Sequence, residues 1–489
     1  MVGAIAPSAL AAVPVSTSAL REAVSAEGIL QHLEAFQEIA DVNGDTRASG
    51  TPGYEASVEY VVAQLEAAGY EVDVQPFDFE YTEVLAAELE QVTPAGGGPF
   101  IYGSDFYIAT GSANGDVTAD VTAIDVLIHN DPDGASTSGC EDEDFADFEA
   151  GDIALIQRGT CFFFEKVANA QEAGASAVII FNEGNAPGRM DTLFPDATGG
   201  TEPITIPVLG ISFDQGQEFY ELSDGDLTLH IAADIFSEIR ETYNVIAELE
   251  GERDDRTVVV GAHLDSVVEG PGINDNGSGS AMILELAVQM AEMGIEPVNT
   301  VRFAWWGAEE SGLLGAQYYV DQLSKRDRKD IAVNLNFDMV ASPNYVRFVY
   351  DGDAGPNGSG VVEDVFLDYF ASQGLPVELT DFDGRSDYGP FIDVGIPAGG
   401  LFTGAEGVKT PEQEDMYGGT AGISYDPCYH AACDDISNIN LTVLEQMADA
   451  AAHATLTFAM TSSAVQGTAK GQANGHAGQV DFRGHRTIR

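Results

Sequence analysis

The sequence contains 489 residues, enough for two or three domains. Its 20 lysine and arginine residues against 80 aspartate and glutamate residues give a formal net charge of -60. A surface this negative repels nucleic-acid phosphates and anionic membranes, so we expect neither partner. The hydrophobic content of 44% argues against intrinsic disorder, and we see no apolar run long enough to cross a membrane.

The two ends of the chain differ in composition from the rest. Residues 1–24 begin with a short apolar stretch that contains an A-x-A pattern but no preceding positive charge, so we interpret them as a leader or propeptide remnant. A disordered N-terminus is the alternative. Residues 463–489 are glycine-rich and basic, and we predict a flexible basic tail there.

Four cysteines fall into two local pairs, Cys140 with Cys161 and Cys428 with Cys433. We favour these two disulfides among the three possible pairings, because each pair is close in sequence and neither forms a CxxC zinc motif. Disulfides persist in oxidising compartments, so we expect a secreted, extracellular protein. Four unrelated thiols in a cytosolic protein are the alternative.

The pattern of apolar residues changes twice along the chain. Residues 27–39 and 54–68 have helical spacing, the second helix ends at Gly69, and residues 70–77 alternate as a strand. Residues 105–235 then carry short strand-like runs and a single helix, which predicts a separate inserted domain. We expect its strands within 116–125, 152–159, 177–182 and 204–212 and its helix at 163–173.

From Tyr243 onward, strands and helices alternate. Continuous apolar runs are typical of strands buried on both faces. This alternation predicts an α/β fold, with a mixed, mostly parallel central sheet and helices on both faces. The strands are expected at 257–263, 301–306 and 332–340, and the helices at 278–293 and 314–323.

Residues of the metal-ligand type follow three of these strands. His263, the pair Glu309-Glu310 and Asp338 stand at strand ends, and Asp275 lies in a glycine-rich loop before a helix. Ligands bind outside the carboxyl ends of strands in open α/β sheets, so these side chains should share one crevice. Alone, each is better explained as a core histidine or a helix cap, but together they favour a metal site.

Mixed imidazole and carboxylate ligands suit zinc, and two zinc ions about 3.5–4 Å apart can share one carboxylate and one water. Such a site needs a further nitrogen ligand, for which His430 is the best candidate because a predicted disulfide would hold it rigid. The sequence has no HExxH motif, which excludes the single-helix zinc arrangement. Four other histidines lie on helical stretches or in the tail (His32, His453, His476 and His485).

The chain resembles the secreted bacterial di-zinc aminopeptidases of the aminopeptidase Y / leucine aminopeptidase type, which are clan MH metallopeptidases. The motifs that carry the resemblance are GAHLDSV, GINDNGSG, RFAWWGAEESGLLGA, NLNFDMV, GRSDYGPF, GLFTGA and CYHAACD. They imply a zinc peptidase catalytic domain made of residues 25–104 and 236–462. Residues 105–235 resemble a protease-associated (PA) domain, a β-rich α/β insertion.

The resemblance implies two zinc ions per chain. Asp275 would bridge both ions, His263 and Asp338 would complete one site, and Glu310 and His430 would complete the other. Some relatives also bind calcium through an N-terminal aspartate and two acids of a C-terminal helix. Here Glu445 and Asp449 match the two acids, but no aspartate stands in the aligned segment SAEG.

Further roles are implied around the metal centre. Glu309 would be the general base, Tyr429 would donate a hydrogen bond to the tetrahedral intermediate, and Asp265 would orient the imidazole of His263. Arg385 would position substrate, and the peptide bond after Asp275 would be cis. Three further residues would line an apolar pocket for the first side chain (Met339, Gly384 and Phe402).

The expected activity is therefore zinc-dependent hydrolysis of the N-terminal bond of peptides and proteins with an apolar first residue, by a monomer. Water activated by the two zinc ions would be the nucleophile. Two alternatives use the same fold: a catalytically inactive receptor or binding module, and a single-zinc glutaminyl cyclase. A carboxypeptidase is disfavoured, because the sequence shows no arginine cluster suited to a free carboxylate.

Overall fold

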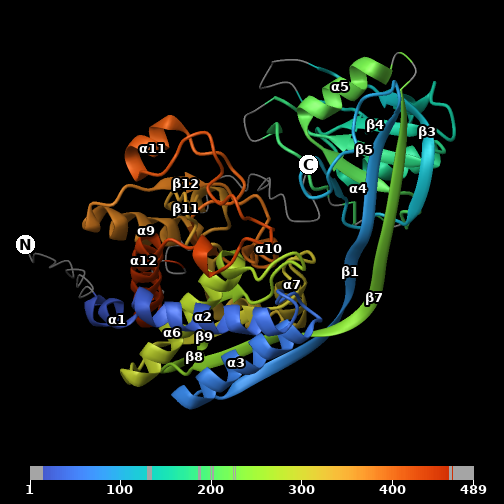
Figure 1. The fold of residues 1–489 in the computed structure, drawn as a ribbon. Coiled ribbons are helices and arrows are strands. Elements are labelled where there is room, and N and C mark those ends of the chain that lie inside the picture. Colours follow the sequence, from blue (N-terminus) through green and yellow to red (C-terminus); the bar gives the residue numbers. More distant parts are fainter. Residues whose placement is uncertain are drawn as a thin grey trace, which may run out of the picture.

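The computed structural model describes residues 15–461 and 465, with gaps at 129–134, 186–188, 196, 199, 201, 202, 224 and 226. The first 14 residues of the predicted leader and, apart from Val465, the predicted basic tail lie outside the described residues. Figure 1 shows two bodies joined by a long ribbon made of β1 (Val72–Thr93) and β7 (Thr228–Leu249).

A 13-stranded sheet runs through both bodies in the order β12-β11-β13-β10-β8-β9-β7-β3-β4-β5-β6-β2, with β1 paired to β7. Its pairings are mixed and mostly parallel within each body, which confirms the predicted fold class. The other strands are β2 (Phe106–Ile108), β3 (Gly115–Ile124), β4 (Ile153–Gln157), β5 (Ala177–Phe181), β6 (Val208–Ile211), β8 (Arg253–His263), β9 (Asn299–Trp306), β10 (Ile331–Phe337), β11 (Phe348–Tyr350), β12 (Glu378–Thr380) and β13 (Ala398–Phe402).

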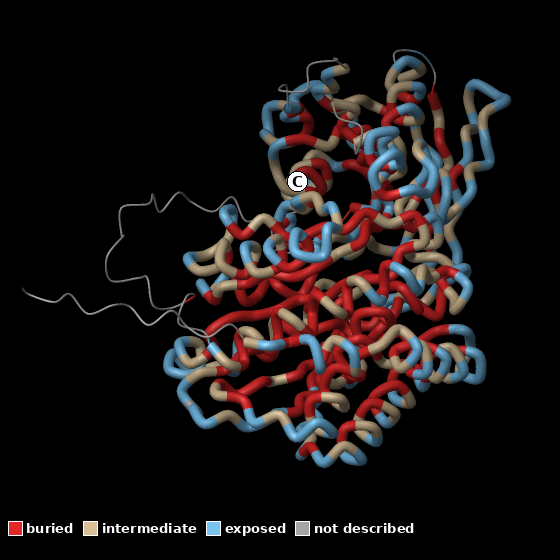
Figure 2. Tube along the Cα trace, turned by 90° about the vertical axis from the view of Figure 1, so that its left-hand side faces the viewer, coloured by how far each residue is buried: buried red, intermediate tan, exposed pale blue. Residues whose placement is uncertain are grey.

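Helices cover both faces of the larger body's sheet, and Figure 2 shows its strands as buried layers beneath a more exposed periphery. Among the described residues, no helix has both the length and the apolar composition that crossing a bilayer requires. The helices are α1 (Ser18–Ala23), α2 (Ala26–Val42), α3 (Pro52–Ala68), α4 (Phe163–Glu172), α5 (Phe213–Ser223), α6 (Gly279–Glu292), α7 (Leu314–Gln322), α8 (Asp327–Asp330), α9 (Ser359–Gln373), α10 (Tyr388–Asp393), α11 (Pro411–Tyr417) and α12 (Leu441–Met460).

Strand β8 shows how one strand serves two cores. Val258 and Val260 pack into the core formed with α2, α3, α6 and α12, whereas Val259 packs into the core formed with α7 and α10. Successive side chains of a strand point to opposite faces, so a strand covered on both sides must be apolar at every position. This requirement explains the continuous apolar run that the sequence shows at 257–263.

The larger body begins before residue 25, where the sequence boundary was placed. Helix α1 packs against α12, and Leu20 and Val24 are buried in the main core. Residues 18–24, which the sequence assigned to a leader or propeptide remnant, therefore pack with the larger body. The helix has only six residues, which is too short for its apolar periodicity to be recognised in the sequence.

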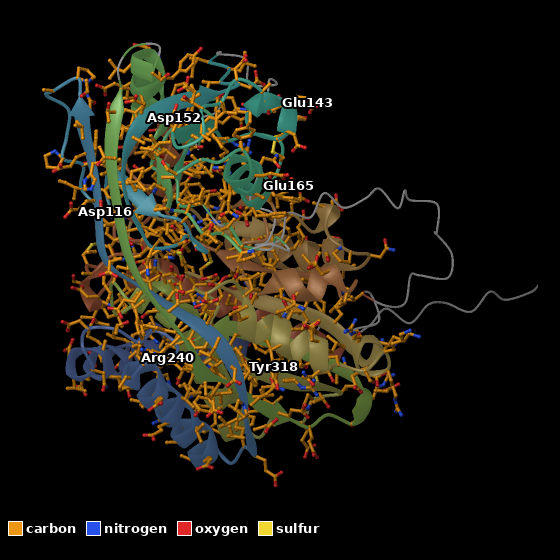
Figure 3. All side chains as sticks on the ribbon, turned by 90° about the vertical axis from the view of Figure 1, so that its right-hand side faces the viewer. Asp116, Glu143, Asp152, Glu165, Arg240 and Tyr318 are labelled. Atoms are coloured by element: carbon orange, nitrogen blue, oxygen red, sulfur yellow. A yellow bond between two sulfur atoms is a disulfide. The ribbon has the colours of Figure 1, made fainter. Side chains whose placement is uncertain are left out.

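The smaller body contains the predicted inserted domain and has two cores of its own. Ile153 and Leu155 of β4 face the core formed with α5, and Ala154 and Ile156 face the core formed with α4. Leu89 of β1 also lies in the first of these cores, so this body includes residues well before 105. The labelled carboxylates in its part of Figure 3 (Asp116, Glu143, Asp152 and Glu165) contribute to its acidic surface.

Both predicted disulfides are present, Cys140–Cys161 in the smaller body and Cys428–Cys433 in the larger one.

The ribbon that joins the bodies is held where it crosses the larger one. The guanidinium of Arg240 lies 3.5 Å from the ring centroid of Tyr81 and donates to the carbonyl oxygen of Gly50, while Phe77 stacks on Tyr318. Figure 3 labels Arg240 and Tyr318 in this region.

A lysine is buried in the core of the smaller body. The Nζ atom of Lys166 donates to the carbonyl oxygen of Ser138 and lies 3.6 Å from the sulfur of Cys140. Burial lowers the pKa of Lys166 to about 8, against the opposing charges of Glu183 and Asp144.

We predict that Lys166 makes the free energy of unfolding rise with pH. Below pH 8 the side chain is protonated in both states, and the folded state carries the full cost of a buried charge. Between about 8 and 10.5 the folded state binds fewer protons than the unfolded state, so stability increases. From pH 7.5 to 9.5, urea unfolding should show a gain of about 2 kcal/mol for the wild type relative to Lys166→Met. Parallel pH profiles for the two proteins would contradict this.

Candidate metal centre

Three neighbouring parallel strands end at the candidate site. His263 is the last residue of β8, Asp338 follows β10, and Glu309 and Glu310 follow β9. Asp275 lies in the segment just before α6, and its backbone there is not helical (φ −106°, ψ 95°). The shared sheet edge therefore brings these side chains together, as the sequence predicts.

The carboxylate of Asp275 contacts both imidazoles through separate oxygens. Its Oδ1 lies 3.4 Å from Nε2 of His263, and its Oδ2 lies 3.2 Å from Nε2 of His430. On one side, Asp338 Oδ1 lies 3.4 Å from Nε2 of His263; on the other, Glu310 Oε2 lies 3.1 Å from Nε2 of His430. The five side chains thus form two groups that share Asp275.

These spacings fit divalent metal ions. Ligand atoms about 2.0–2.2 Å from a tetrahedral zinc ion are separated from one another by roughly 3.4 Å. In the described part of the chain, no hydrogen-bond donor reaches Glu310 Oε1 or Asp338 Oδ1, although both atoms are buried. Two sets of residues have ligand atoms within 4.8 Å of one another: His263 with Glu309 and Asp338, and His263 with Asp275 and Glu310.

The electrostatics of the site also favour cations. Burial raises the pKa of Glu310 to about 7, and the charge of Asp275 acts in the same direction, while His430 opposes both. Burial likewise raises the pKa of Glu309, with His263 opposing and Asp387 and Glu310 adding to the shift. Several carboxylates in one buried space repel one another, and bound cations would relieve that repulsion.

Asp265 holds two of the site's residues in place. Its carbonyl oxygen lies 3.0 Å from Nδ1 of His263, its Oδ1 lies 3.6 Å from the same atom, and that Oδ1 accepts the backbone N–H of Glu309. Because a carbonyl oxygen only accepts, Nδ1 carries the proton and Nε2 presents its lone pair to the centre. The nearer partner is the carbonyl oxygen rather than the carboxylate that the resemblance implied.

Side chains on either side of Asp275 fasten its loop to the chain around Asp338. The amide of Asn276 donates to the carbonyl oxygen of Phe337 and accepts the N–H of Met339. The amide oxygen of Asn274 accepts the N–H of Ala341. The predicted cis peptide bond between Asp275 and Asn276 is present. The side chains of Asn274 and Asn276 thus hold the loop, and the side chain of Asp275 between them faces the centre.

The sequence did not predict Ser386, which orients Asp338. Its hydroxyl donates to Asp338 Oδ2 at 2.7 Å and accepts from Nδ2 of Asn336 at 2.7 Å. The neighbouring Asp387 is fully buried, and no hydrogen-bond donor among the described residues reaches either of its oxygens. Both stand in the motif GRSDYGPF, where we had selected only Gly384 and Arg385.

Tyr429 and Arg385 meet at the open side of the centre. The ring of Tyr429 stacks on the imidazole of His430 at a centroid distance of 3.9 Å. Arg385 donates to the hydroxyl of Tyr429 at 3.1 Å and to Oε1 of Glu406 at 2.6 Å. Because Arg385 supplies the proton in the first bond, the hydroxyl of Tyr429 keeps its own proton for another acceptor.

A cavity opens beside these residues and reaches the metal centre. Gly384 is not among its lining residues; its φ of 85° turns the chain, and its N–H donates to the hydroxyl of Tyr388. The sequence did not predict Phe348 and Tyr425, because both come from segments without a recognised motif. The apolar part of the wall consists of Met339, Phe348, Phe402, Ala405 and Tyr425, and the acidic part of Asp381, Asp383 and Glu406.

Charges at the site act on side chains of the smaller body. Burial lowers the pKa of Arg158 to about 10; the charges of Arg189 and Arg385 add to the effect, while Glu406 acts against it. Burial raises the pKa of Tyr107 in the smaller body, and the charge of His430 opposes that shift. Arg385, Glu406 and His430 belong to the larger body, so the inserted domain approaches the mouth of the site.

A buried arginine supports the loop between His263 and Asp275. The guanidinium of Arg47 donates to the carbonyl oxygens of Leu264, Pro271 and Gly272. Burial lowers its pKa to about 10, and the charges of Asp265 and Asp434 oppose that shift. Arg47 is therefore a fully enclosed cation beneath a group of acids.

The two candidate calcium ligands have protein partners. Glu445 accepts the backbone N–H of Ala26, and Asp449 lies 3.6 Å from the guanidinium of Arg21.

Comparison with known proteins identifies both parts of the chain. Residues 244–455 match peptidase family M28, and residues 117–219 match the PA domain. An aminopeptidase of Pseudomonas aeruginosa is 47% identical over 455 residues, covering 91% of this chain and 83% of that protein. Leucine aminopeptidase 2 of Trichophyton tonsurans is 37% identical over 436 residues, covering 87% of this chain and 82% of that protein.

The fold is also similar to a solved structure described as a zinc aminopeptidase from Bacillus subtilis. The TM-score is 0.62 at 26% sequence identity, and the match covers 90% of this chain and 96% of that chain.

We predict that Arg47→Met lowers the free energy of unfolding by about 3–5 kcal/mol, because it leaves buried carbonyl oxygens and carboxylates without their cation. The matched control is Arg326→Met. The Arg326 side chain is 81% exposed and pairs with Asp330, so its loss should cost less than about 0.5 kcal/mol. Urea denaturation of both variants measures the difference, and equal effects would contradict a supporting role for Arg47.

Proposed function

The chain belongs to peptidase family M28 and is a metallo-aminopeptidase, and on this basis we propose how its residues remove the first residue of a peptide. Structural similarity to a zinc aminopeptidase supports zinc as the metal. The observation that carries the proposal is the position of Asp275, whose two oxygens lie 3.4 Å and 3.2 Å from different imidazole nitrogens. One carboxylate placed in this way can serve two metal ions at once.

We assign two zinc ions to each chain. His263 and Asp338 would hold one ion, Glu310 and His430 would hold the other, and Asp275 would bind both. When bound, zinc supplies Lewis acidity, which polarises the scissile carbonyl group and lowers the pKa of water at the site. The proposal needs no calcium ion, because Glu445 and Asp449 already have partners within the protein.

Glu309 is the proposed general base. It follows the same strand as Glu310, and its Oε2 lies 4.0 Å from Nε2 of His263, farther than the oxygens assigned to the metal. A carboxylate beside the metal ligands can take a proton from the attacking water and return it to the leaving amine. Water then adds to the carbonyl carbon, the C–N bond breaks, and the amine leaves neutral.

Tyr429 is the proposed donor to the oxygen that becomes negative during the reaction. Arg385 fixes its hydroxyl from one side, so that the phenolic proton can point toward the substrate. The stacking of its ring on His430 keeps it next to the metal centre. Arg385, itself paired with Glu406, would position the substrate.

The cavity favours a substrate with an apolar first residue. Met339, Phe348 and Phe402 provide an apolar wall, and the rings of Phe348 and Phe402 stack at a centroid distance of 5.9 Å. The carboxylates around the centre are suited to a free α-amine, which is a cation when protonated. The name of a relative, leucine aminopeptidase 2, agrees with this preference.

We further propose that the protein acts outside the cell as a monomer on peptides and proteins with a free N-terminus. Its two disulfides support an oxidising location.

We predict that Glu309→Gln retains zinc but lowers kcat at least about 100-fold, because it removes the proton carrier without removing a ligand. Hydrolysis of leucine p-nitroanilide and zinc content should be measured on the same preparations. In the wild type, a chelator should abolish hydrolysis, and added zinc should restore it.

Near wild-type turnover by Glu309→Gln would exclude the role of general base. A wild-type protein without zinc and without hydrolysis would favour the inactive binding module. Cyclisation of an N-terminal glutamine peptide would favour the glutaminyl cyclase.

The apolar pocket can be tested separately. We predict that Phe402→Ala raises KM for leucine p-nitroanilide about tenfold with little change in kcat, because truncation of a partly buried aromatic ring removes at least about 1.4 kcal/mol of apolar contact. Glycine p-nitroanilide serves as the internal control, since glycine has no side chain to fill the pocket. Equal effects on both substrates would contradict the assignment.

A further inference from the structure

The loops that carry Asp275 and His430 meet at the metal centre, and an interaction must hold them together. Asp275 and His430 come from segments far apart in the sequence, and neither lies within a regular helix or strand. The loop of His430 is closed by the disulfide between Cys428 and Cys433. That bond restrains this loop but makes no covalent link to the loop of Asp275.

Asp434, the residue after this disulfide, grips the backbone before Asp275 with three acceptors. Its carbonyl oxygen accepts the N–H of Ile273 at 3.0 Å. Its Oδ1 accepts the N–H of Asn274 at 2.9 Å, and its Oδ2 accepts the N–H of Asp275 at 2.9 Å. Three consecutive amides are thus bound by one residue.

Asp434 is also tied to its own loop. Its N–H donates to the carbonyl oxygen of Ala431, the residue after His430, at 2.9 Å. The side chain is 2% exposed, so water does not compete for these bonds. Bonds from N–H groups to a carboxylate are about twice as strong as bonds between neutral groups. The orientation of Asp275 is therefore linked to the loop that carries His430.

A second buried carboxylate, Asp426, offers a close comparison. Nδ2 of Asn438 donates to both Asp434 and Asp426. Asp426 binds the side chain of Asn274 at 2.6 Å, whereas Asp434 binds the backbone of Asn274 and Asp275. The two acids therefore share Asn438 and Asn274 as partner residues and have similar burial, but of the two only Asp434 contacts the backbone of Asp275.

We propose that Asp434 is a positioning residue that orients the carboxylate of Asp275 for both metal ions before either ion binds. It stands outside the five proposed ligands and acts through the backbone amides of residues 274 and 275. This inference rests on the proposed function, because it assigns a support to the proposed bridging ligand. It predicts that loss of the clamp weakens both metal positions together.

Asp434→Asn is the sharpest test, because it changes a single oxygen into an NH2 group. One of the two amides would then face a donor instead of an acceptor, and a buried N–H would lose its partner. Zinc-loaded protein is mixed with a chelator, and the release of zinc is followed with a colorimetric dye. We expect both zinc ions to leave at least about tenfold faster than in the wild type. Asp426→Asn is the matched control and should change the rate less than about threefold.

A readout beyond stability separates positioning from simple support of the fold. With zinc in excess, Asp434→Asn should show a lower kcat at similar KM, since the substrate pocket is untouched. Wild-type zinc retention in Asp434→Asn would overturn the proposal. Equal zinc loss in both variants would also overturn it, because that result indicates only a general loosening of the buried acids.

A measurement on the unmodified protein keeps the proposal testable if the variant does not fold. Hydrogen exchange of the amides of residues 273–275 should be slow in the metal-free wild type, because Asp434 rather than a metal ion holds them. Rapid exchange that slows only after zinc is added would overturn the proposal. Slow exchange in a protein that neither binds zinc nor hydrolyses peptides would instead refute the proposed function.

Discussion

The carboxylate of Asp275 sets the main constraint on the larger body, because it must face two imidazoles from different parts of the chain. His263 is placed by the end of β8, and His430 is placed by a disulfide-closed loop. Asp275 itself has no regular structure to hold it. Its position therefore depends on hydrogen bonds from both sides, from Asp434 on one and through Asn276 on the other.

Electrostatics explains why so many acids can be buried at one place. A buried carboxylate is costly unless a cation or several donors compensate it. Arg47 provides one internal cation beneath the loop, and each of its three guanidinium nitrogens donates to a backbone carbonyl oxygen. Among the described residues, no hydrogen-bond donor reaches Glu310 Oε1 or Asp338 Oδ1. Divalent metal ions can compensate the negative charge of these two carboxylates, for which the described residues supply no donor.

Sequence patterns predicted the parts of the structure that depend on local information. The helix predicted at 54–68 with its end at Gly69 corresponds to α3, which the structure begins two residues earlier, after Thr51 as its N-cap. The convergence of His263, Glu309 and Asp338 follows from the rule that strand ends share one edge of a sheet. For the further assignments, such as His430 as the fifth ligand, local signals were weaker, and the family motifs supplied the roles.

The missed features depend on contacts between distant segments. Ser386, Asn276 and Asp434 act through hydrogen bonds to chain segments at least 48 residues away, which no local periodicity records. The length of the β1–β7 ribbon was missed for a different reason. In its middle, at residues 83–88 and 234–241, no side chain is buried, so the alternation that marks a half-buried strand is lost there.

That ribbon determines where the inserted domain stands relative to the site. Strand β7 pairs with β3 of the smaller body at one end and with β9 of the larger body at the other, so both bodies belong to one sheet. Between these ends, residues 234–244 pair only with β1, and Arg240 anchors this stretch to the loop at Gly50. A continuous strand resists bending less where it has one partner than where it has two. The position of the smaller body, and with it that of Arg158 and Tyr107, therefore depends on this stretch of the ribbon.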